Sequence, residues 1–452
     1  MTSLRNLISS VRAELPATPL ARWASVFFSL CVLTMLISLA ASQAFLALAA
    51  IFYAAHLLRH PTAPRFPPVK LPLALFLLTT LISIFFAENP TVGWVDIRKF
   101  VLFLILLLAV NLVVTARHLK WLYGGVFLGA ALAGLYGVRQ FALQYREVRA
   151  LHPGQVYSYM TATRITGFMG HWMNFGGQEM LAFAALVAFL LLSGFGVRGS
   201  EFGVQHGRSK RPLAMISDAD RRPPTPGPRP PSLWWLALAI IALSILLNFT
   251  RGVWLGCFVA SVYVVSRCRA RALWALPVLV AAIYLAAPGL VRDRLNSLRH
   301  PAADPSLAMR FEIWHAGLAM IRRHPWVGVG PNNINEVYTL YLPRGYQPEV
   351  GYHEHMHNDA LQVAAERGLP CLAAWLWFMI ALSWRFVKIR QRLARAGQST
   401  WVADAALAGW LAFVAEGFFE FNFGTSPVLM VFLFVISTPF VAEGLWVNER
   451  HQ

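Results

Sequence analysis

Long hydrophobic stretches separated by short polar segments dominate the pattern along the chain. Several stretches reach or approach the roughly 20 residues that an α-helix needs to cross a bilayer, and segments with the alternation of a β-barrel strand are not found. The pattern predicts an all-α polytopic membrane protein with about twelve transmembrane helices. These spans are expected near residues 23–41, 43–58, 70–87, 100–115, 119–142, 174–195, 233–249, 251–266, 272–289, 359–384, 400–421 and 426–446.

The composition supports a membrane protein. Hydrophobic residues make up 57% of the chain and charged residues only 13%, whereas a soluble protein carries about a quarter charged residues. The stretch at 23–41 is long for a signal peptide, so we expect an uncleaved first span. The four cysteines are scattered and form no CxxC pair, so neither a disulfide framework nor a zinc cluster is expected.

The basic residues indicate the orientation in the membrane. A net charge of +18 would suggest a nucleic-acid partner in a soluble protein, but here the positive-inside rule accounts for much of it. With the N-terminus in the cytoplasm, short cytoplasmic loops gather Lys and Arg, as at Arg267, Arg269 and Arg271. An even number of spans then places both termini in the cytoplasm, and no nucleic-acid partner is expected.

Two loops are long. Residues 196–232 are basic and proline-rich, which is typical of a disordered cytoplasmic linker, although they could also meet lipid headgroups. The loop domain, 290–357, lies on the outer face and should fold; it divides nine spans in 1–289 from three in 358–452. Its segment 306–324 is too polar to span and is predicted to form a helix along the membrane surface. The apolar residues at helical spacing in it are Met309, Ile313, Leu318, Met320 and Ile321.

Two arginines lie on the outer face, where the charge rule does not require them. Arg251 stands in a very short turn between two spans, and Arg164 stands in the glycine-rich loop 161–178 before the sixth span. Guanidinium groups match phosphate oxygens, so these positions could form an anion site. The alternatives are that Arg251 extends to lipid headgroups and that Arg164 is a solvated charge.

The segment "VGYHEHMHND" (350–359) places His353, His355 and His357 just before an apolar stretch. In an extended segment the three share one face and could bind zinc, although no cysteine or HExxH frame accompanies them. A polar loop without a role is a second interpretation. The third is a general base, because neutral imidazole accepts a proton from a hydroxyl near pH 7.

An outer site with guanidinium groups and a base suits a lipid-linked phosphate or pyrophosphate donor and a hydroxyl acceptor. The chain contains no Walker loop, Rossmann fingerprint or paired-carboxylate glycosidase pattern. A transporter is an alternative from another class and would need polar residues at mid-membrane. The candidates for that are Glu179, Glu416 and Glu420, all of which fall near span ends or in one late helix.

Three stretches resemble the bacterial O-antigen ligase/O-antigen polymerase superfamily. "TRGVWLG" (250–256) is similar to its arginine-containing turn, and "RFEIWHAGLAMIRRHPWVGVGPNN" (310–333) is similar to its Trp-bearing helix with His-Pro and Gly-x-Gly. "HNDALQVAAERGLPC" (357–371) matches its His-Asn, nine residues, then Gly. Cys371 replaces the second glycine of that pattern, which should affect helix packing more than chemistry.

The resemblance implies a GT-C-like glycosyltransferase of the Gram-negative inner membrane, with a periplasmic active site. The implied reaction transfers polysaccharide from undecaprenyl pyrophosphate to a sugar hydroxyl of lipid A–core, inverting and without metal or cofactor. Polymerisation of repeat units and protein O-glycosylation remain sister alternatives. The resemblance assigns the base to His357 and pyrophosphate contacts to Arg164 and Arg251. Possible supporting residues are Asn358 (orienting His357 or capping the tenth span), Arg310, His315, His324 and His355.

Overall fold

A computed structural model describes residues 14–193, 231–286, 289–296, 305–342 and 355–451. These residues form helices and connections, and no strand occurs within the described ranges. Nearly all of the predicted linker, and His353, lie outside them. The α-helices are α2 (Pro19–Thr34), α3 (Leu39–Arg59), α4 (Lys70–Phe85), α5 (Pro90–Ile97), α6 (Leu104–Leu112), α7 (Ala116–Leu151), α8 (Val156–Ala162), α9 (Trp172–Leu192), α10 (Ser232–Leu247), α11 (Arg251–Cys268), α12 (Ala275–Ala286), α13 (Gly289–Asn296), α14 (Pro305–Arg323), α15 (Ile334–Val337), α16 (Asp359–Arg395), α17 (Trp401–Gly417) and α18 (Ser426–His451). Short 3-10 helices cover Arg98–Phe103, Ala270–Trp274, Tyr338–Tyr341 and Asn422–Gly424.

The helices confirm the predicted all-α class. Most described residues of the predicted spans are helical, but the span expected at 23–41 crosses the break between α2 and α3. Five helices (α3, α7, α9, α16 and α18) are long and apolar enough to cross a membrane. The total number of crossings stays a prediction. One predicted boundary is wrong in a way that matters: the span placed at 400–421 ends at Gly417, so Glu420 lies in the connection to α18.

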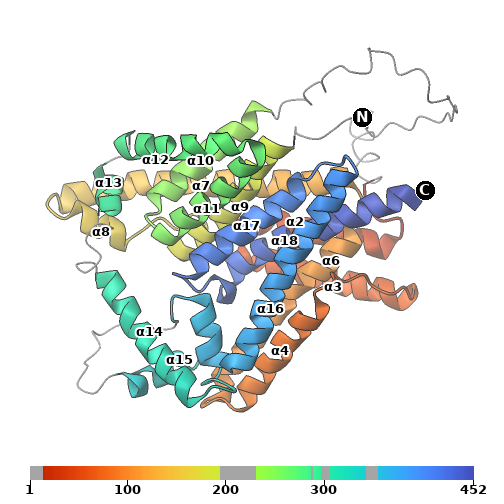
Figure 1. The fold of residues 1–452 in the computed structure, drawn as a ribbon, viewed down its shortest axis with the longest axis horizontal. Helices are drawn as coiled ribbons and strands as arrows, with labels where there is room; N and C mark the ends of the chain where they lie inside the picture. The colour runs from red at the N-terminus through yellow and green to blue at the C-terminus, as the bar shows by residue number, and fades with distance from the viewer. Residues whose placement is uncertain (1–13, 194–230, 287–288, 297–304, 343–354, 452) are drawn as a thin grey trace.

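The interior of the bundle is built around α9, α17 and α18, which pack against one another, and α11 packs against α9 and α17 (Figure 1). Small residues allow this close packing. A Cβ at Gly256 of α11 would lie 2.1 Å from the sulfur of Met180 and 2.9 Å from the carbonyl oxygen of Ala412. Helices α9, α11 and α17 are therefore closely packed where Gly256 lies.

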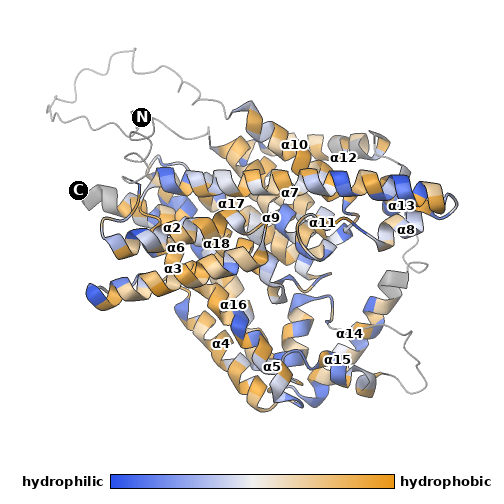
Figure 2. Ribbon diagram, turned by 180° about the vertical axis from the view of Figure 1, so that it is seen from behind, coloured by the Kyte–Doolittle hydropathy of each residue, from blue (hydrophilic) through white to orange (hydrophobic). Residues whose placement is uncertain are grey.

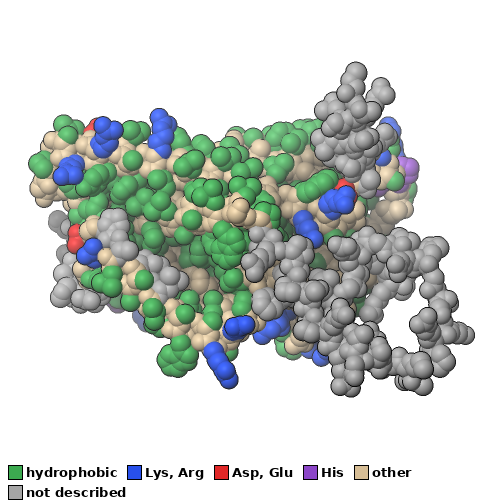
Figure 3. Space-filling model, turned by 90° about the horizontal axis from the view of Figure 1, so that it is seen from above, with side chains coloured by type: hydrophobic (Ala, Val, Ile, Leu, Met, Phe, Trp, Pro, Cys, Tyr) green, Lys and Arg blue, Asp and Glu red, His purple; other side chains and the backbone are tan. Residues whose placement is uncertain are grey.

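The outer sides of the bundle remain apolar. Large hydrophobic side chains such as Ile51, Leu78, Ile380 and Trp384 are exposed, and hydrophobic residues make up much of α3 and α4 in Figure 2. Hydrophobic side chains also dominate the described part of the surface in Figure 3, where charged side chains are sparse. A soluble monomer rarely exposes so much contiguous apolar surface, whereas lipid would cover it.

The described part of the loop domain forms a small core of its own. Helix α14 buries Ile313, Ala316 and Met320 against Met356 and Ala365. The predicted helix at 306–324 is therefore confirmed, but its apolar face meets protein, and Leu318 is exposed on another side. In Figure 1, α14 runs from the α8–α13 end of the molecule to α15, beside α4 and α16.

Helix α16 is interrupted at Gly368, where φ is 82°, so the predicted tenth span is not one continuous helix. Residues 359–367 form a separate helical piece that is joined by backbone hydrogen bonds to 325–330. The amide of Gly330 donates to the carbonyl of Glu366 (2.8 Å), and the amide of Leu369 donates to that of Pro325 (2.7 Å). Gly328 (φ 67°) permits this approach, because a Cβ there would lie 2.2 Å from the carbonyl carbon of Glu366.

Candidate functional site

The side chain of Asn248 links the turn between α10 and α11 to the loop between α8 and α9. Asn248 ends α10, is fully buried, and donates from Nδ2 to the carbonyls of Ile165 and Trp172, each at 3.1 Å. The loop that carries Arg164 is thereby fixed to the α10–α11 turn that precedes Arg251. Two residues far apart in the sequence thus reach one region of the molecule.

The loop also fixes the direction of the Arg164 side chain. Its Nε donates to the carbonyl of Thr161 (2.8 Å), and its guanidinium carbon lies 5.4 Å from the ring centroid of Trp172. These contacts use Nε and one face of the guanidinium group. The side chain is partly buried, as an anion-binding group at the edge of a membrane protein would be.

Arg251 is the first residue of α11, at the end of the helix where the backbone dipole favours negative charge. The preceding turn contains Phe249 in the left-handed region (φ 56°), a conformation that costs about 1–3 kcal/mol in a non-glycine residue and is concentrated at functional sites. The carbonyl of Phe249 accepts a hydrogen bond from Arg294 Nε (3.3 Å). The turn therefore brings α13 to the same place.

Arg294, Arg310 and Arg251 lie near enough to Arg164 for their charges to act on it, and we call Arg164, Arg251, Arg294 and Arg310 the arginine cluster. Burial, together with the positive charges of Arg294, Arg310 and Arg251, lowers the pKa of Arg164 to about 10, while Glu420 opposes the change. The guanidinium group remains charged at neutral pH. Positive charges gathered from four segments form a site for a multivalent anion, because each guanidinium can donate to phosphate oxygens.

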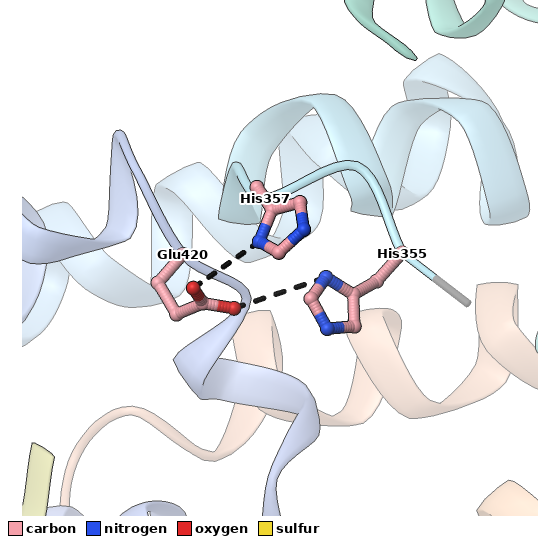
Figure 4. A group of neighbouring side chains, drawn as sticks. All are labelled: His355, His357 and Glu420. Carbon is pink, nitrogen blue, oxygen red and sulfur yellow. Dashed lines mark hydrogen bonds and ion pairs between the residues drawn. The ribbon is translucent and has the colours of Figure 1, made fainter. Parts of the chain in front are cut away.

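Beside the cluster, two histidines meet one carboxylate (Figure 4). His357 Nδ1 lies 3.2 Å from Glu420 Oε2, and His355 Nδ1 lies 3.8 Å from Glu420 Oε1. The two imidazole rings are 4.2 Å apart between centroids, at an interplanar angle of 74°. Glu420 is 6% exposed at its side chain and His357 17%, so the pair is shielded but accessible.

The residue between the two histidines explains their arrangement. Met356 is fully buried in the loop-domain core; its amide donates to Gln362 Oε1 (2.6 Å) and its carbonyl accepts from Trp314 Nε1 (2.9 Å). Its two neighbours are thereby held in place on either side. His357 adopts a φ of 48°, a strained value that these contacts maintain.

The charge of Glu420 determines the tautomer of His357. Burial alone would raise the pKa of Glu420, but the hydrogen bond from His357 and the charges of His357 and His355 lower it to about 2. An ionised carboxylate can only accept, so Nδ1 of His357 is the donor. In the neutral ring Nε2 is then the proton acceptor, as a general base requires.

Asn358 caps α16, as the sequence predicts. Its Oδ1 accepts from the amide of Leu361 (2.8 Å), and its Nδ2 donates to the carbonyl of Phe418 (3.2 Å). The second bond joins the segment of His357 to the connection that carries Glu420. Asn358 therefore supports the histidine–carboxylate pair through the backbone.

The structure separates the other predicted residues. Arg310 joins the arginine cluster. His315 is exposed on α14 and bonds to the carbonyl of Phe311 in its own helix (2.8 Å). His324 follows the far end of α14 and bonds through Nε2 to the hydroxyl of Tyr341 (2.8 Å), so its contacts serve the loop-domain fold.

Two residues of the site were not predicted. Glu420 falls at the end of the predicted span 400–421, and Arg294 lies in the long loop 290–357 without a predicted role. The sequence does hold a weak signal for Glu420, since Phe-Glu-Phe-Asn-Phe-Gly interrupts the apolar stretch with polar residues just before a new helix. Arg294 has no comparable signal, because its place depends on how α13 packs.

The histidine–carboxylate group also has the composition of a metal site. One ligand atom from each of His355, His357 and Glu420 lies within 4.8 Å of the others. Two imidazoles and one carboxylate form a set that zinc accepts with a fourth position open. The same side chains therefore support two kinds of chemistry, proton transfer and cation binding.

The arrangement can hold a multivalent anion next to a base. Residues 236–376 match the family model described as O-antigen ligase. No curated protein matches the chain. The matched segment contains Arg251, Arg294, Arg310 and His357, whereas Arg164 and Glu420 lie outside it and reach the site through the fold. Residues 236–376 therefore form a domain of the O-antigen ligase family, which confirms the resemblance to the O-antigen ligase/polymerase superfamily.

Proposed function

We propose that the protein is an O-antigen ligase, which transfers polysaccharide from undecaprenyl pyrophosphate to a sugar hydroxyl of lipid A–core. The observation that carries the proposal is the arginine cluster beside the His357–Glu420 pair. A lipid-linked donor presents a diphosphate and a reactive anomeric carbon, and the acceptor presents a hydroxyl. The two parts of the site match these two requirements.

In the proposed reaction the arginine cluster binds the diphosphate, with Arg164 and Arg251 as its main contacts. His357 Nε2 takes the proton of the acceptor hydroxyl while the oxygen attacks the anomeric carbon from the face opposite the diphosphate. The bond from the anomeric carbon to the diphosphate oxygen breaks, and configuration inverts. Guanidinium groups stabilise the charge that grows on the leaving undecaprenyl diphosphate.

Glu420 and Asn358 would act through His357. The carboxylate keeps the ring oriented with Nε2 directed away from it and stabilises the imidazolium that forms. Asn358 holds the backbone beside it. No step in this scheme requires a metal ion or a cofactor.

We further propose twelve transmembrane helices in the inner membrane of a Gram-negative bacterium, with both termini cytoplasmic and the site periplasmic. The coincidence of helices with the predicted spans and the apolar outer surface support this arrangement. Residues 1–289 and 358–452 would be the membrane parts, and 290–357 the periplasmic loop domain. A cysteine-accessibility experiment with Ser158→Cys and Arg392→Cys tests the orientation, since only the first should react from the periplasm.

The test of the function is transfer by purified protein in nanodiscs. With an undecaprenyl-pyrophosphate-linked glycan and lipid A–core, the expected product is glycosylated lipid A–core, formed equally well with EDTA. Lipopolysaccharide of a deletion strain separates the sister activity: loss of a ligase leaves bare core and polymer on its carrier, whereas loss of a polymerase leaves core with a single repeat. Solute uptake into liposomes without glycan transfer would instead indicate a transporter.

A further inference from the structure

The group formed by His355, His357 and Glu420 has a geometry that general-base catalysis does not need. A base requires one histidine and one orienting partner, and His357 with Glu420 already provides both. His355 lies on the other oxygen of the same carboxylate, and its ring meets that of His357 at 4.2 Å. The second imidazole therefore calls for a separate explanation.

We propose that His355, His357 and Glu420 bind a transition-metal cation such as Zn²⁺, and that the bound cation blocks the base. The ligand atoms already lie within 4.8 Å of one another. Bonds of about 2.0–2.1 Å in tetrahedral geometry place two ligands about 3.3 Å apart, so small side-chain rotations would close the site. The cation would bind Nδ1 of His357, the nitrogen nearest Glu420, and displace the proton there to solvent. The neutral ring then carries its proton on Nε2, which can no longer accept one from a hydroxyl.

The site is held by the surrounding structure. The peptide between the histidines is anchored through Met356, which is fully buried, and Glu420 accepts a hydrogen bond from the amide of Phe421 (3.2 Å). All three side chains are partly or fully shielded from solvent. A cation binding there would join the segment before α16 to the connection between α17 and α18, with little rearrangement of either.

The donor set determines which cation binds. Imidazole suits zinc, cobalt, nickel and copper, whereas magnesium and calcium prefer oxygen ligands. The nearby arginine cluster repels cations, so we expect micromolar rather than nanomolar affinity for Zn²⁺. Binding should strengthen as pH rises, because the imidazoles must lose their protons.

The binding test uses the full-length protein in nanodiscs, without a polyhistidine tag and without glycan substrates. Titration with Co²⁺ should give visible d–d absorption at one equivalent, and Zn²⁺ should displace it, while Mg²⁺ should not. His355→Gln is expected to weaken binding by about 100-fold, as loss of a ligand requires. His315→Gln, which changes an exposed histidine on α14, is the matched control and should bind as the wild type does.

Each outcome decides the proposal. Equal affinity in His355→Gln and the wild type, or no cobalt signal at all, overturns the site. If His355→Gln does not fold, Glu420→Gln reports on the same site and should lose binding. The blocking role rests on the proposed function: Zn²⁺ that binds the wild type without inhibiting glycan transfer disproves the blocking and leaves the binding. Failure of transfer without metal would instead count against the proposed function.

Discussion

His357 and Glu420 lie at the ends of two different helices, one just before α16 and the other just after α17, yet their side chains meet at 3.2 Å. Neither connection alone would position the imidazole. The pair exists because α16 and α17 pack together and because Asn358 bonds to Phe418 across the gap. The proposed base is thus held by tertiary contacts, and changes to its partner can be tested separately from changes to itself.

Substitution of the base and its partner should have graded effects on transfer. His357→Ala is expected to insert and fold but to lower kcat by about 10²–10⁴-fold, the range for loss of a general base. Glu420→Gln keeps a hydrogen-bonding group and should lower kcat less, by about tenfold. Glycan transfer by purified protein measures both, with Glu443→Gln, at the far end of α18, as control. Wild-type turnover in His357→Ala would remove the base assignment.

The ionisation of Glu420 predicts a pH-dependent stability difference. Its pKa falls from the ordinary 4.5 to about 2 in the folded protein, so its stabilising effect is complete above pH 4.5 and lost as pH falls towards 2. Glu420→Gln should therefore lower Tm by several degrees at pH 6 and by much less at pH 3. Scanning fluorimetry in detergent measures the difference. A difference in Tm between wild type and Glu420→Gln that stays constant or widens at acidic pH would contradict the ionised Glu420.

Arg294 should matter for donor binding although no role for it is predicted from the sequence. Arg294→Lys keeps the charge but loses the planar fork and the bond from Nε to Phe249, so we expect kcat/KM for the lipid-linked donor to fall by about 10- to 100-fold. Arg322→Lys, which changes an exposed arginine near the C-terminal end of α14, is the control and should change the donor kinetics little. Equal donor kinetics in the two variants would exclude Arg294 from the site.

Asn248 should couple stability to donor binding. Asn248→Ala leaves the carbonyls of Ile165 and Trp172 without their buried donor, at a cost of about 1–3 kcal/mol. Because the loop of Arg164 is released, KM for the donor should rise as Tm falls. Ser261→Ala, which removes only a bond within α11, is the comparison. A lower Tm with unchanged KM would show that Asn248 does not position Arg164.

Gly328 should be intolerant of a side chain. Gly328→Ala combines a positive φ with a Cβ placed 2.2 Å from the carbonyl carbon of Glu366, and we expect destabilisation of about 3 kcal/mol or more. Folded yield and Tm measure it. Gly444→Ala, where a Cβ meets nothing within 4 Å, should be close to wild type. If both variants melt alike, the contact between the two backbones is unimportant for stability.

Hydropathy was sufficient to predict the long apolar helices, because a helix in lipid must be mostly apolar along its length, whereas short helices such as α5, α8 and α13 were not predicted. It failed where local geometry interrupts the pattern. Residues 359–384 are predicted as one span, but Gly368 has a positive φ and Pro370 follows it, so the helix is interrupted there. The separate piece before the interruption bonds to 325–330, a contact that hydropathy does not predict. Leu318 fits helical spacing yet is exposed, because Ile313 and Met320 define the buried side of α14.

In the candidate site, too, some residues could be predicted from the sequence, whereas the contacts between them could not. Arg164 and Arg251 could be recognised because they fall on the predicted outer face, where the charge rule does not require them, and His357 because it matches the His-Asn pattern of the family. Their proximity could not be recognised, since it depends on Asn248 and on how α13 and α14 pack. Glu420 was misplaced by the few residues that separate the end of α17 from the predicted end of the span.

The arginine cluster has a consequence for the protein without ligand. Four like charges from four separate segments repel one another, and keeping them together opposes folding. A bound diphosphate removes that repulsion and links the segments through one small molecule. The protein with its anion is therefore expected to be more rigid than the protein without it. Binding of the donor should then order the site before the acceptor binds.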